Sequence, residues 1–175
     1  MPAAADAVLV TGTVGVGKTS VGESLSAYLE HAQVSHALID TDAVRRMWPS
    51  PADDPFHLAL ELANVAAVAA NYRGAGAQRF VVTGVLERGE DRARYAEALG
   101  AERLFVARLT ADEHVVRRRL IARHDDDPDG LRWHLARRGE LEAILDAAQL
   151  EDVLVDTTRL SPRDAAERIA ASADW

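Results

Sequence analysis

The sequence of 175 residues contains no cysteine. This absence excludes disulfide bonds, cysteine nucleophiles and thiolate metal sites, so any bound metal ion is expected on oxygen ligands. No apolar run approaches the roughly 20 residues that a membrane-spanning helix requires. Residues 1–6 also lack the basic residues of a signal peptide. We therefore expect a cytoplasmic protein with no membrane association.

Lysine is nearly absent as well. Lys18 is the only lysine among the 20 basic residues, and all the others are arginines. A genome whose codon usage favours arginine accounts for the general imbalance but not for the location of the one exception. A compact ammonium on a flexible stem reaches between phosphate oxygens where a planar guanidinium does not fit. The lone lysine therefore favours a phosphate-binding role for Lys18.

The acidic residues outnumber the basic ones, which gives a formal net charge of -8. A protein of this charge is not expected to cover nucleic acid or an anionic membrane surface. With 48% hydrophobic residues the chain is long enough to bury one core but short for two independently stable domains. We expect one domain over residues 1–175, as a monomer or homodimer.

Short apolar runs typical of strands alternate along the chain with stretches of helical periodicity. This alternation predicts an α/β fold with a five-stranded parallel sheet, helices on both faces and ligands at the carboxyl ends of the strands. The turn-rich segment 124–130 is expected to form a short mobile lid. We expect strands at residues 7–11, 36–39, 80–83, 104–109 and 153–155, and helices at residues 18–30, 57–73, 91–99, 112–123, 131–148 and 162–171.

The segment after the first predicted strand has the complete phosphate-loop pattern of Gly, four residues, Gly, Lys and Thr. Its glycines let successive N–H groups point inward, and the following helix adds the positive end of its dipole. We expect Lys18 to bridge the β- and γ-phosphates of ATP and Thr19 to ligate Mg²⁺. The alternative is a glycine-rich turn without a ligand. The predicted cofactor-binding residues are Gly12, Thr13, Val14, Gly15, Val16, Gly17, Lys18, Thr19 and Ser20.

Two carboxylates follow the second predicted strand in the sequence Asp40-Thr41-Asp42. Asp40 could hold Mg²⁺ and its water shell, and Asp42 could accept the proton of a hydroxyl that attacks the γ-phosphate. The alternative is that Asp42 is the N-cap of a helix beginning near Ala43, because aspartate is common at that position. Capping and catalysis are compatible.

The phosphate loop together with Asp40-Thr41-Asp42-Ala43-Val44-Arg45 resembles the small P-loop kinases of the nucleoside-monophosphate-kinase fold. Shikimate kinase, gluconate kinase and adenylylsulfate kinase are the groups it looks most like. The resemblance implies that Asp40 assists Mg²⁺ and that Asp42 contacts the reacting hydroxyl. Arg45 matches an arginine of the adenylylsulfate kinases and is therefore a predicted acceptor-binding residue.

The third predicted strand and the residues after it also resemble these kinases. Gly84 corresponds to a glycine that shapes the acceptor pocket of shikimate kinases, but Val85 and Leu86 replace the glycines that follow there. Shikimate is therefore not the expected substrate. Glu87 lies at the predicted cleft edge and is a further acceptor-binding candidate, for which a solvated charge is the alternative.

Arginines before the predicted lid resemble those that contact the transferring phosphate in these kinases. Arg119 and Arg123 fit this pattern, and a solvated helix face is the alternative. Arg137 and Arg138, after the predicted lid, are the other candidates for the same role. Residues 155–162 resemble the final strand and loop that pack against the adenine base.

These observations predict a kinase that transfers the γ-phosphate of Mg·ATP to a hydroxyl or phosphate of a small metabolite. One alternative is a nucleoside or nucleotide kinase, which shares the fold. Another is an ATP-binding switch or an ATPase module without an acceptor. A GTPase switch is disfavoured, because its guanine-reading Asn-Lys-x-Asp motif needs a second lysine.

Overall fold

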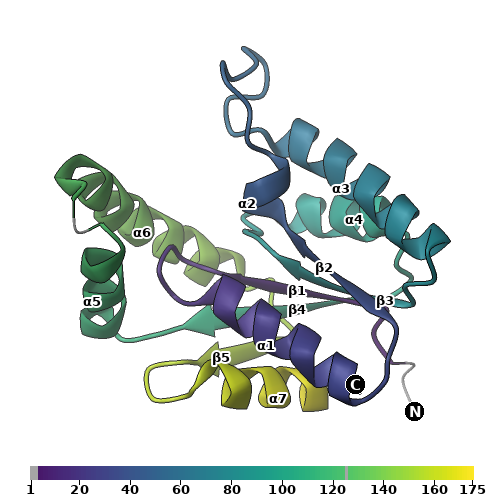
Figure 1. Cartoon of the computed structure of the whole chain (residues 1–175). Coiled ribbons are helices and arrows are strands. Elements are labelled where there is room, and N and C mark those ends of the chain that lie inside the picture. The colour runs from purple at the N-terminus through teal and green to yellow at the C-terminus, as the bar shows by residue number, and fades with distance from the viewer. Residues whose placement is uncertain (1–3, 125) are drawn as a thin grey trace.

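The computed structural model describes residues 4–124 and 126–175. Five parallel strands form one sheet in the order β2-β3-β1-β4-β5 (Figure 1). The predicted five-stranded parallel sheet is thus confirmed. The strands are β1 (Ala7–Gly12), β2 (His36–Asp40), β3 (Arg79–Thr83), β4 (Leu104–Thr110) and β5 (Val153–Asp156).

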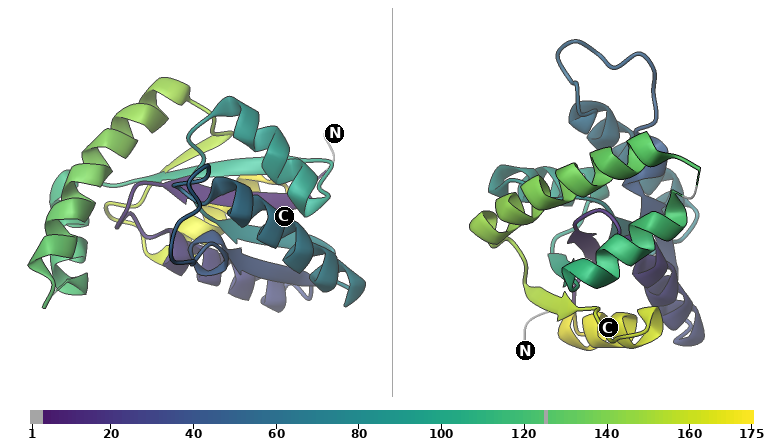
Figure 2. Two further views of the ribbon diagram at one scale, coloured as in Figure 1. Left: turned by 90° about the horizontal axis from the view of Figure 1, so that it is seen from above. Right: turned by 90° about the vertical axis from the view of Figure 1, so that its left-hand side faces the viewer.

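Helices cover both faces of this sheet because alternate residues of each strand point to opposite sides. In β1, Val8 and Val10 join the apolar core under α1 and α7, whereas Leu9 joins the core under α3 and α4. The α5–α6 pair stands beyond the carboxyl ends of the strands (Figures 1 and 2). The helices are α1 (Lys18–His31), α2 (Thr41–Val44), α3 (Leu58–Gly74), α4 (Gly89–Leu99), α5 (Glu113–Arg123), α6 (Pro128–Ala148) and α7 (Pro162–Ser172).

The strand register brings the phosphate loop and the aspartate pair to the same edge of the sheet. Thr83, at the end of β3, pairs with Val10 of β1 on one side and with Asp40 of β2 on the other. Because the strands are parallel, the segments that follow β1, β2 and β3 all leave the sheet at this edge. Within the described residues, no helix has the length and hydropathy needed to cross a membrane.

Several helix starts differ from the sequence-based expectation by one to three residues, and those of α2 and α6 are set by aspartate caps. The short helix α2 begins at Thr41, and its N-cap is Asp40, whose Oδ1 accepts the backbone N–H of Asp42 at 2.9 Å. The alternative that Asp42 is the cap is therefore wrong. Helix α6 begins three residues before the predicted Leu131, because the Asp127 side chain accepts the backbone N–H of Gly130 at 2.9 Å.

The predicted lid, residues 124–130, is therefore partly helical, since its last three residues form the first turn of α6. Asp125, within this segment, lies outside the described residues, as do residues 1–3 of the predicted domain. The closing motion of this lid stays a prediction.

Candidate functional site

The phosphate loop wraps around the N-terminus of α1, and two of its glycines are required by the local geometry. Gly12 has φ 144°, and a Cβ there would lie 2.6 Å from the Leu109 carbonyl oxygen. Gly15 has φ 78°, and a Cβ there would lie 2.8 Å from Cγ of Leu120. Any side chain would therefore displace the loop from β4 or α5. The first turn of α1 leaves backbone N–H groups free of intrahelical partners, which suits an anionic ligand.

Lys18 folds its side chain over this loop. Its Nζ donates to the carbonyl oxygens of Gly12 and Thr13, each at 3.0 Å. Burial lowers the pKa of Lys18 from its ordinary 10.5 to about 8, although the nearby carboxylate of Asp42 opposes the shift. The ammonium charge is thus poorly compensated by the protein, and a bound anion would stabilise it.

A cleft of about 730 Å³ opens over the loop between α2, α5 and the segment after β5. Among the described residues that line it, Asp42 alone carries a carboxylate, whereas five carry a cationic group: Lys18, Arg45, Arg46, Arg119 and Arg123. This concentration of positive charge occurs in a chain whose net charge is -8. A cleft lined in this way favours a polyanionic ligand, and it has the size of a typical ligand pocket.

Of the arginines predicted to contact the transferring phosphate, the two on α5 line this cleft. Arg119 donates through Nη1 to the Val16 carbonyl at 3.0 Å and through Nη2 to the Thr157 carbonyl at 3.4 Å. Arg123 lines the same wall one turn further along α5. Arg137 and Arg138 do not line it, because each forms an ion pair elsewhere: Arg137 with Glu87 at 2.6 Å and Arg138 with Glu142 at 2.8 Å.

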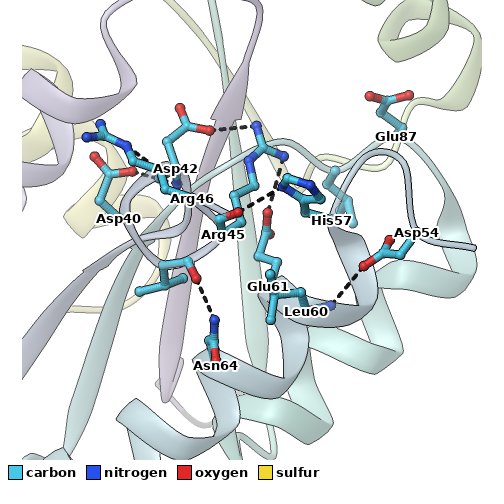
Figure 3. Close-up of polar contacts among 12 residues, drawn as sticks. Asp40, Asp42, Arg45, Arg46, Asp54, His57, Leu60, Glu61, Asn64 and Glu87 are labelled. Atoms are coloured by element: carbon cyan, nitrogen blue, oxygen red, sulfur yellow. Dashed lines mark hydrogen bonds and ion pairs between the residues drawn. The ribbon is translucent and has the colours of Figure 1, made fainter. Parts of the chain in front are cut away.

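The acidic residues after β2 face different surroundings (Figure 3). The carboxylate of Asp42 lines the cleft, has 57% of its side chain exposed, and accepts Nη2 of Arg45 at 2.6 Å. Asp40 is at the base of α2 and is not among the cleft-lining residues described. The structure therefore brings Lys18, Asp42, Arg45, Arg119 and Arg123 together, along with residues 14–20 of the loop.

Residues 8–145 match the family model described as an AAA domain. The chain belongs to this AAA domain family. No curated protein sequence matches it. The predicted resemblance to small P-loop kinases is confirmed at the level of the fold, because shikimate kinase, gluconokinase and APS kinase structures share it.

Three solved structures align with nearly the whole length of this AAA domain protein. The tunicamycin resistance protein of Deinococcus radiodurans is 22% identical with a TM-score of 0.66, and the match covers 94% of this chain and 93% of that one. A gluconokinase from Sinorhizobium meliloti 1021 is 22% identical with a TM-score of 0.58, over 96% and 91%. The Mycobacterium tuberculosis APS kinase CysC, in complex with AMPPNP and APS, is 18% identical with a TM-score of 0.59, over 99% and 100%. At these identities the likeness concerns the fold alone.

Other predicted residues of this AAA domain have packing or pairing roles in the structure. A Cβ on Gly84 would lie 2.7 Å from Oγ1 of Thr41, so the glycine lets the end of β3 approach α2. Glu87 pairs with Arg137 of α6 at 2.6 Å. Neither Gly84 nor Glu87 is among the described residues that line the cleft. Their contact with an acceptor stays a prediction.

Sequence reasoning predicted Asp42 and Arg45 on the acceptor side of the site but did not predict the hollow that they line. A hollow of about 540 Å³ adjoins the cleft and shares Asp42, Arg45 and Arg46 with it, while Met47 and Trp48 add an apolar wall. Trp48 is 91% exposed. This hollow is shallow and open to solvent, and it offers a surface for a second ligand next to the Asp42 carboxylate.

A buried carboxylate on α3 also escaped sequence reasoning. Glu61 is 1% exposed; its Oε1 accepts the Tyr95 hydroxyl, and its Oε2 accepts Nη1 of Arg45 at 3.3 Å. Burial raises the pKa of Glu61, although the Tyr95 and Arg45 contacts oppose the shift. Burial and the neighbouring Glu61 raise the pKa of Tyr95, so its hydroxyl keeps its proton. The available signal was an acidic residue within an otherwise apolar helix.

A magnesium ion fits the donors that the chain offers here. Thr19 has a hydroxyl oxygen and Asp40 a carboxylate, and Mg²⁺ prefers oxygen ligands while keeping several of its waters. Among residues 4–124 and 126–175, no three His, Cys, Asp or Glu side chains are grouped to hold a metal. Thr19 and Asp40 remain the proposed ligands.

The low pKa of Lys18 predicts a pH dependence of nucleotide binding. Phosphates stabilise the protonated amine, so the free protein must take up a proton on binding once the pH exceeds about 8. The affinity for Mg·AMPPNP should be constant between pH 7 and the pKa of about 8, then fall by roughly tenfold per pH unit.

Calorimetry across this pH range checks the affinity. Because Lys18 is the only lysine, selective ¹⁵N-lysine labelling gives one side-chain signal that reports its titration directly. If the affinity for Mg·AMPPNP stayed constant up to two pH units above that pKa, Lys18 would not contact the phosphates.

Proposed function

We propose that this protein is a kinase that transfers the γ-phosphate of Mg·ATP to a hydroxyl of a small metabolite. The observation that carries the proposal is the cleft with five cationic groups that ends at the Asp42 carboxylate, beside a second hollow of about 540 Å³. An ATPase without an acceptor needs the first compartment but not the second. The APS kinase CysC, which has this fold, binds AMPPNP together with APS.

In the proposed reaction, the nucleotide phosphates lie along the phosphate loop. Lys18 leaves its loop carbonyls to contact phosphate oxygens, and Arg119 and Arg123 approach the γ-phosphate from α5. These groups neutralise the charge that develops as the bond between the γ-phosphorus and the bridging oxygen breaks. Magnesium, held by Thr19 and Asp40, would supply further neutralisation of the phosphate charge.

The acceptor occupies the second hollow, with its hydroxyl directed at Asp42. The hydroxyl oxygen forms the new bond to phosphorus, its proton passes to the Asp42 carboxylate, and ADP leaves with the electron pair of the broken bond. Leu160 and Pro162 line the other end of the cleft, where residues 155–162 are proposed to meet the adenine base.

A coupled ADP-release assay over a panel of acceptors tests this function. The panel contains hydroxylated acids, sugars, nucleosides, nucleoside monophosphates and antibiotics; tunicamycin is included because a structural neighbour is a tunicamycin resistance protein. A kinase should release ADP faster with its acceptor than with water alone. Equal ADP release with every compound and with none would favour an ATPase, and stimulation by nucleosides or nucleotides alone would favour the nucleoside or nucleotide kinase.

A further inference from the structure

Glu61 raises a physical question, because a buried carboxylate costs free energy unless its oxygens are satisfied. Among the described residues, Glu61 and Asp91 are the buried acidic residues. Asp91 pairs with Arg88, the N-cap residue of α4, and with Arg94 of the same helix. Glu61 instead faces the site, since its partner Arg45 lines the cleft.

A continuous set of contacts connects the apolar core to the proposed base. The Tyr95 hydroxyl donates to Oε1 of Glu61, and Nη1 of Arg45 donates to Oε2 of Glu61 at 3.3 Å. Nη2 of the same guanidinium donates to Oδ1 of Asp42 at 2.6 Å. One planar guanidinium thus joins the buried carboxylate to the cleft carboxylate, and its rigidity transmits orientation from one to the other (Figure 3).

The backbone of the Arg45 turn is held by other contacts. His57 donates through Nδ1 to the Arg45 carbonyl at 2.9 Å, and Asn64 donates through Nδ2 to the Val44 carbonyl at 2.5 Å. The turn therefore keeps its place without Glu61. What Glu61 adds is restraint of the Arg45 side chain, which is 35% exposed and would otherwise sample several rotamers.

We propose that Glu61 is a positioning residue that orients Asp42 for the acceptor hydroxyl by fixing the guanidinium of Arg45. The proposal rests on the proposed kinase function. It assigns to Arg45 a contact with the base in addition to any contact with the acceptor. The effect of Glu61 on turnover should accordingly pass through Asp42.

The test compares Glu61→Gln with Asp91→Asn, which removes a buried carboxylate whose ion pairs are with Arg88 and Arg94. Tyr95→Phe is the second variant, because it removes only the hydroxyl that supports Glu61.

The first measurement is side-chain NMR of Arg45 with Mg·AMPPNP bound, in which the Arg45 signal is assigned by its loss in Arg45→Lys. The spectra should show slow guanidinium rotation in the wild type and in Asp91→Asn. Rotation should be fast in Glu61→Gln and intermediate in Tyr95→Phe. Affinity for Mg·AMPPNP should stay within about twofold of the wild type in all three.

Steady-state kinetics test whether the effect of Glu61 on turnover passes through Asp42. With the compound that stimulates ADP release, Glu61→Gln should lower kcat by roughly 10–100-fold, as expected for misplacement of a reacting group, with an unchanged KM for ATP. In an Asp42→Asn background the same substitution should cost less than twofold, because the two residues act as a unit.

Two results would overturn the proposal: slow Arg45 rotation that persists in Glu61→Gln, or an equal loss from Glu61→Gln with and without Asp42. Failure of the kinase function is a different result, namely no compound that stimulates ADP release. In that case the Arg45 spectrum with Mg·AMPPNP alone still decides whether Glu61 fixes Arg45.

Discussion

Replacing Lys18 with alanine should lower phosphoryl transfer by at least roughly 10²–10³-fold, the usual loss when a group that stabilises transition-state charge is removed. The ammonium lies at the phosphate loop, and its charge is poorly compensated there, as its lowered pKa indicates. Phosphate oxygens would supply the missing compensation, most of all when charge accumulates during transfer. The affinity for Mg·AMPPNP should fall as well.

The fold should survive this substitution. Lys18 donates to two loop carbonyls, and such hydrogen bonds contribute about 1 kcal/mol each at most sites. Removing a cation that burial disfavours offsets part of that loss. Thermal unfolding of Lys18→Ala should therefore stay close to that of the wild type.

Lys18→Arg is the matched control, because it keeps the charge but changes its shape. A planar guanidinium is larger than an ammonium and cannot place one compact charge between phosphate oxygens. We expect Lys18→Arg to bind Mg·AMPPNP better than Lys18→Ala and to remain impaired in turnover. Calorimetry and the ADP-release assay measure both properties. Wild-type affinity and turnover in Lys18→Ala would exclude phosphate binding by this residue.

The parts of the site that sequence could predict are local in the chain. The phosphate loop has its glycines, its lysine and its threonine within residues 12–19, and the strand–loop–helix context is read from adjacent residues. Strand alternation likewise predicts the sheet, because each strand is recognised from its own few residues. Parallel strands then bring their carboxyl ends together, which places Asp40 and Asp42 near the loop without further information.

The parts that sequence could not predict depend on contacts between distant residues. Glu61 contacts Tyr95, 34 positions away, and Arg45, 16 positions away. Periodicity predicts α3 as a buried helix but does not tell which side chain its one buried carboxylate will meet. The alternative that Asp42 caps α2 is wrong for a different reason. The helix has only four residues, so an error of two residues in its start moves the cap from Asp40 to Asp42.

Asp42→Asn should selectively slow the phosphorylation of the acceptor. Losing a positioned general base costs roughly 10²–10⁴-fold in acceptor turnover. Binding of Mg·AMPPNP should stay close to wild type, because the phosphate loop, Arg119 and Arg123 are intact. Stability should change little, since Asp42 is 57% exposed and its ion pair with Arg45 lies at the surface of the cleft.

Asp40→Asn should impair acceptor phosphorylation and background ATP hydrolysis together, because Asp40 is proposed to hold the Mg²⁺ that would serve both reactions. Asparagine caps helices about as well as aspartate, so this variant removes the charge while keeping the acceptor for the Asp42 N–H. Asp40→Ala is its matched control. It removes the cap as well and should lower the free energy of unfolding by about 1 kcal/mol, which chemical denaturation measures.

The contrast between the two aspartates separates a kinase from an ATPase. In a kinase, acceptor turnover of Asp42→Asn falls while background hydrolysis stays, whereas both fall in Asp40→Asn. The transition state of phosphoryl transfer is loose and requires little early proton abstraction, so part of the Asp42 effect comes from losing the orientation of the acceptor. The selectivity is therefore a sharper criterion than the size of the loss. Full acceptor turnover in Asp42→Asn would remove this residue from the mechanism. Its place in the cleft would then be explained by its ion pair with Arg45 and by its position in the first turn of α2, where a negative charge meets the positive end of the helix dipole.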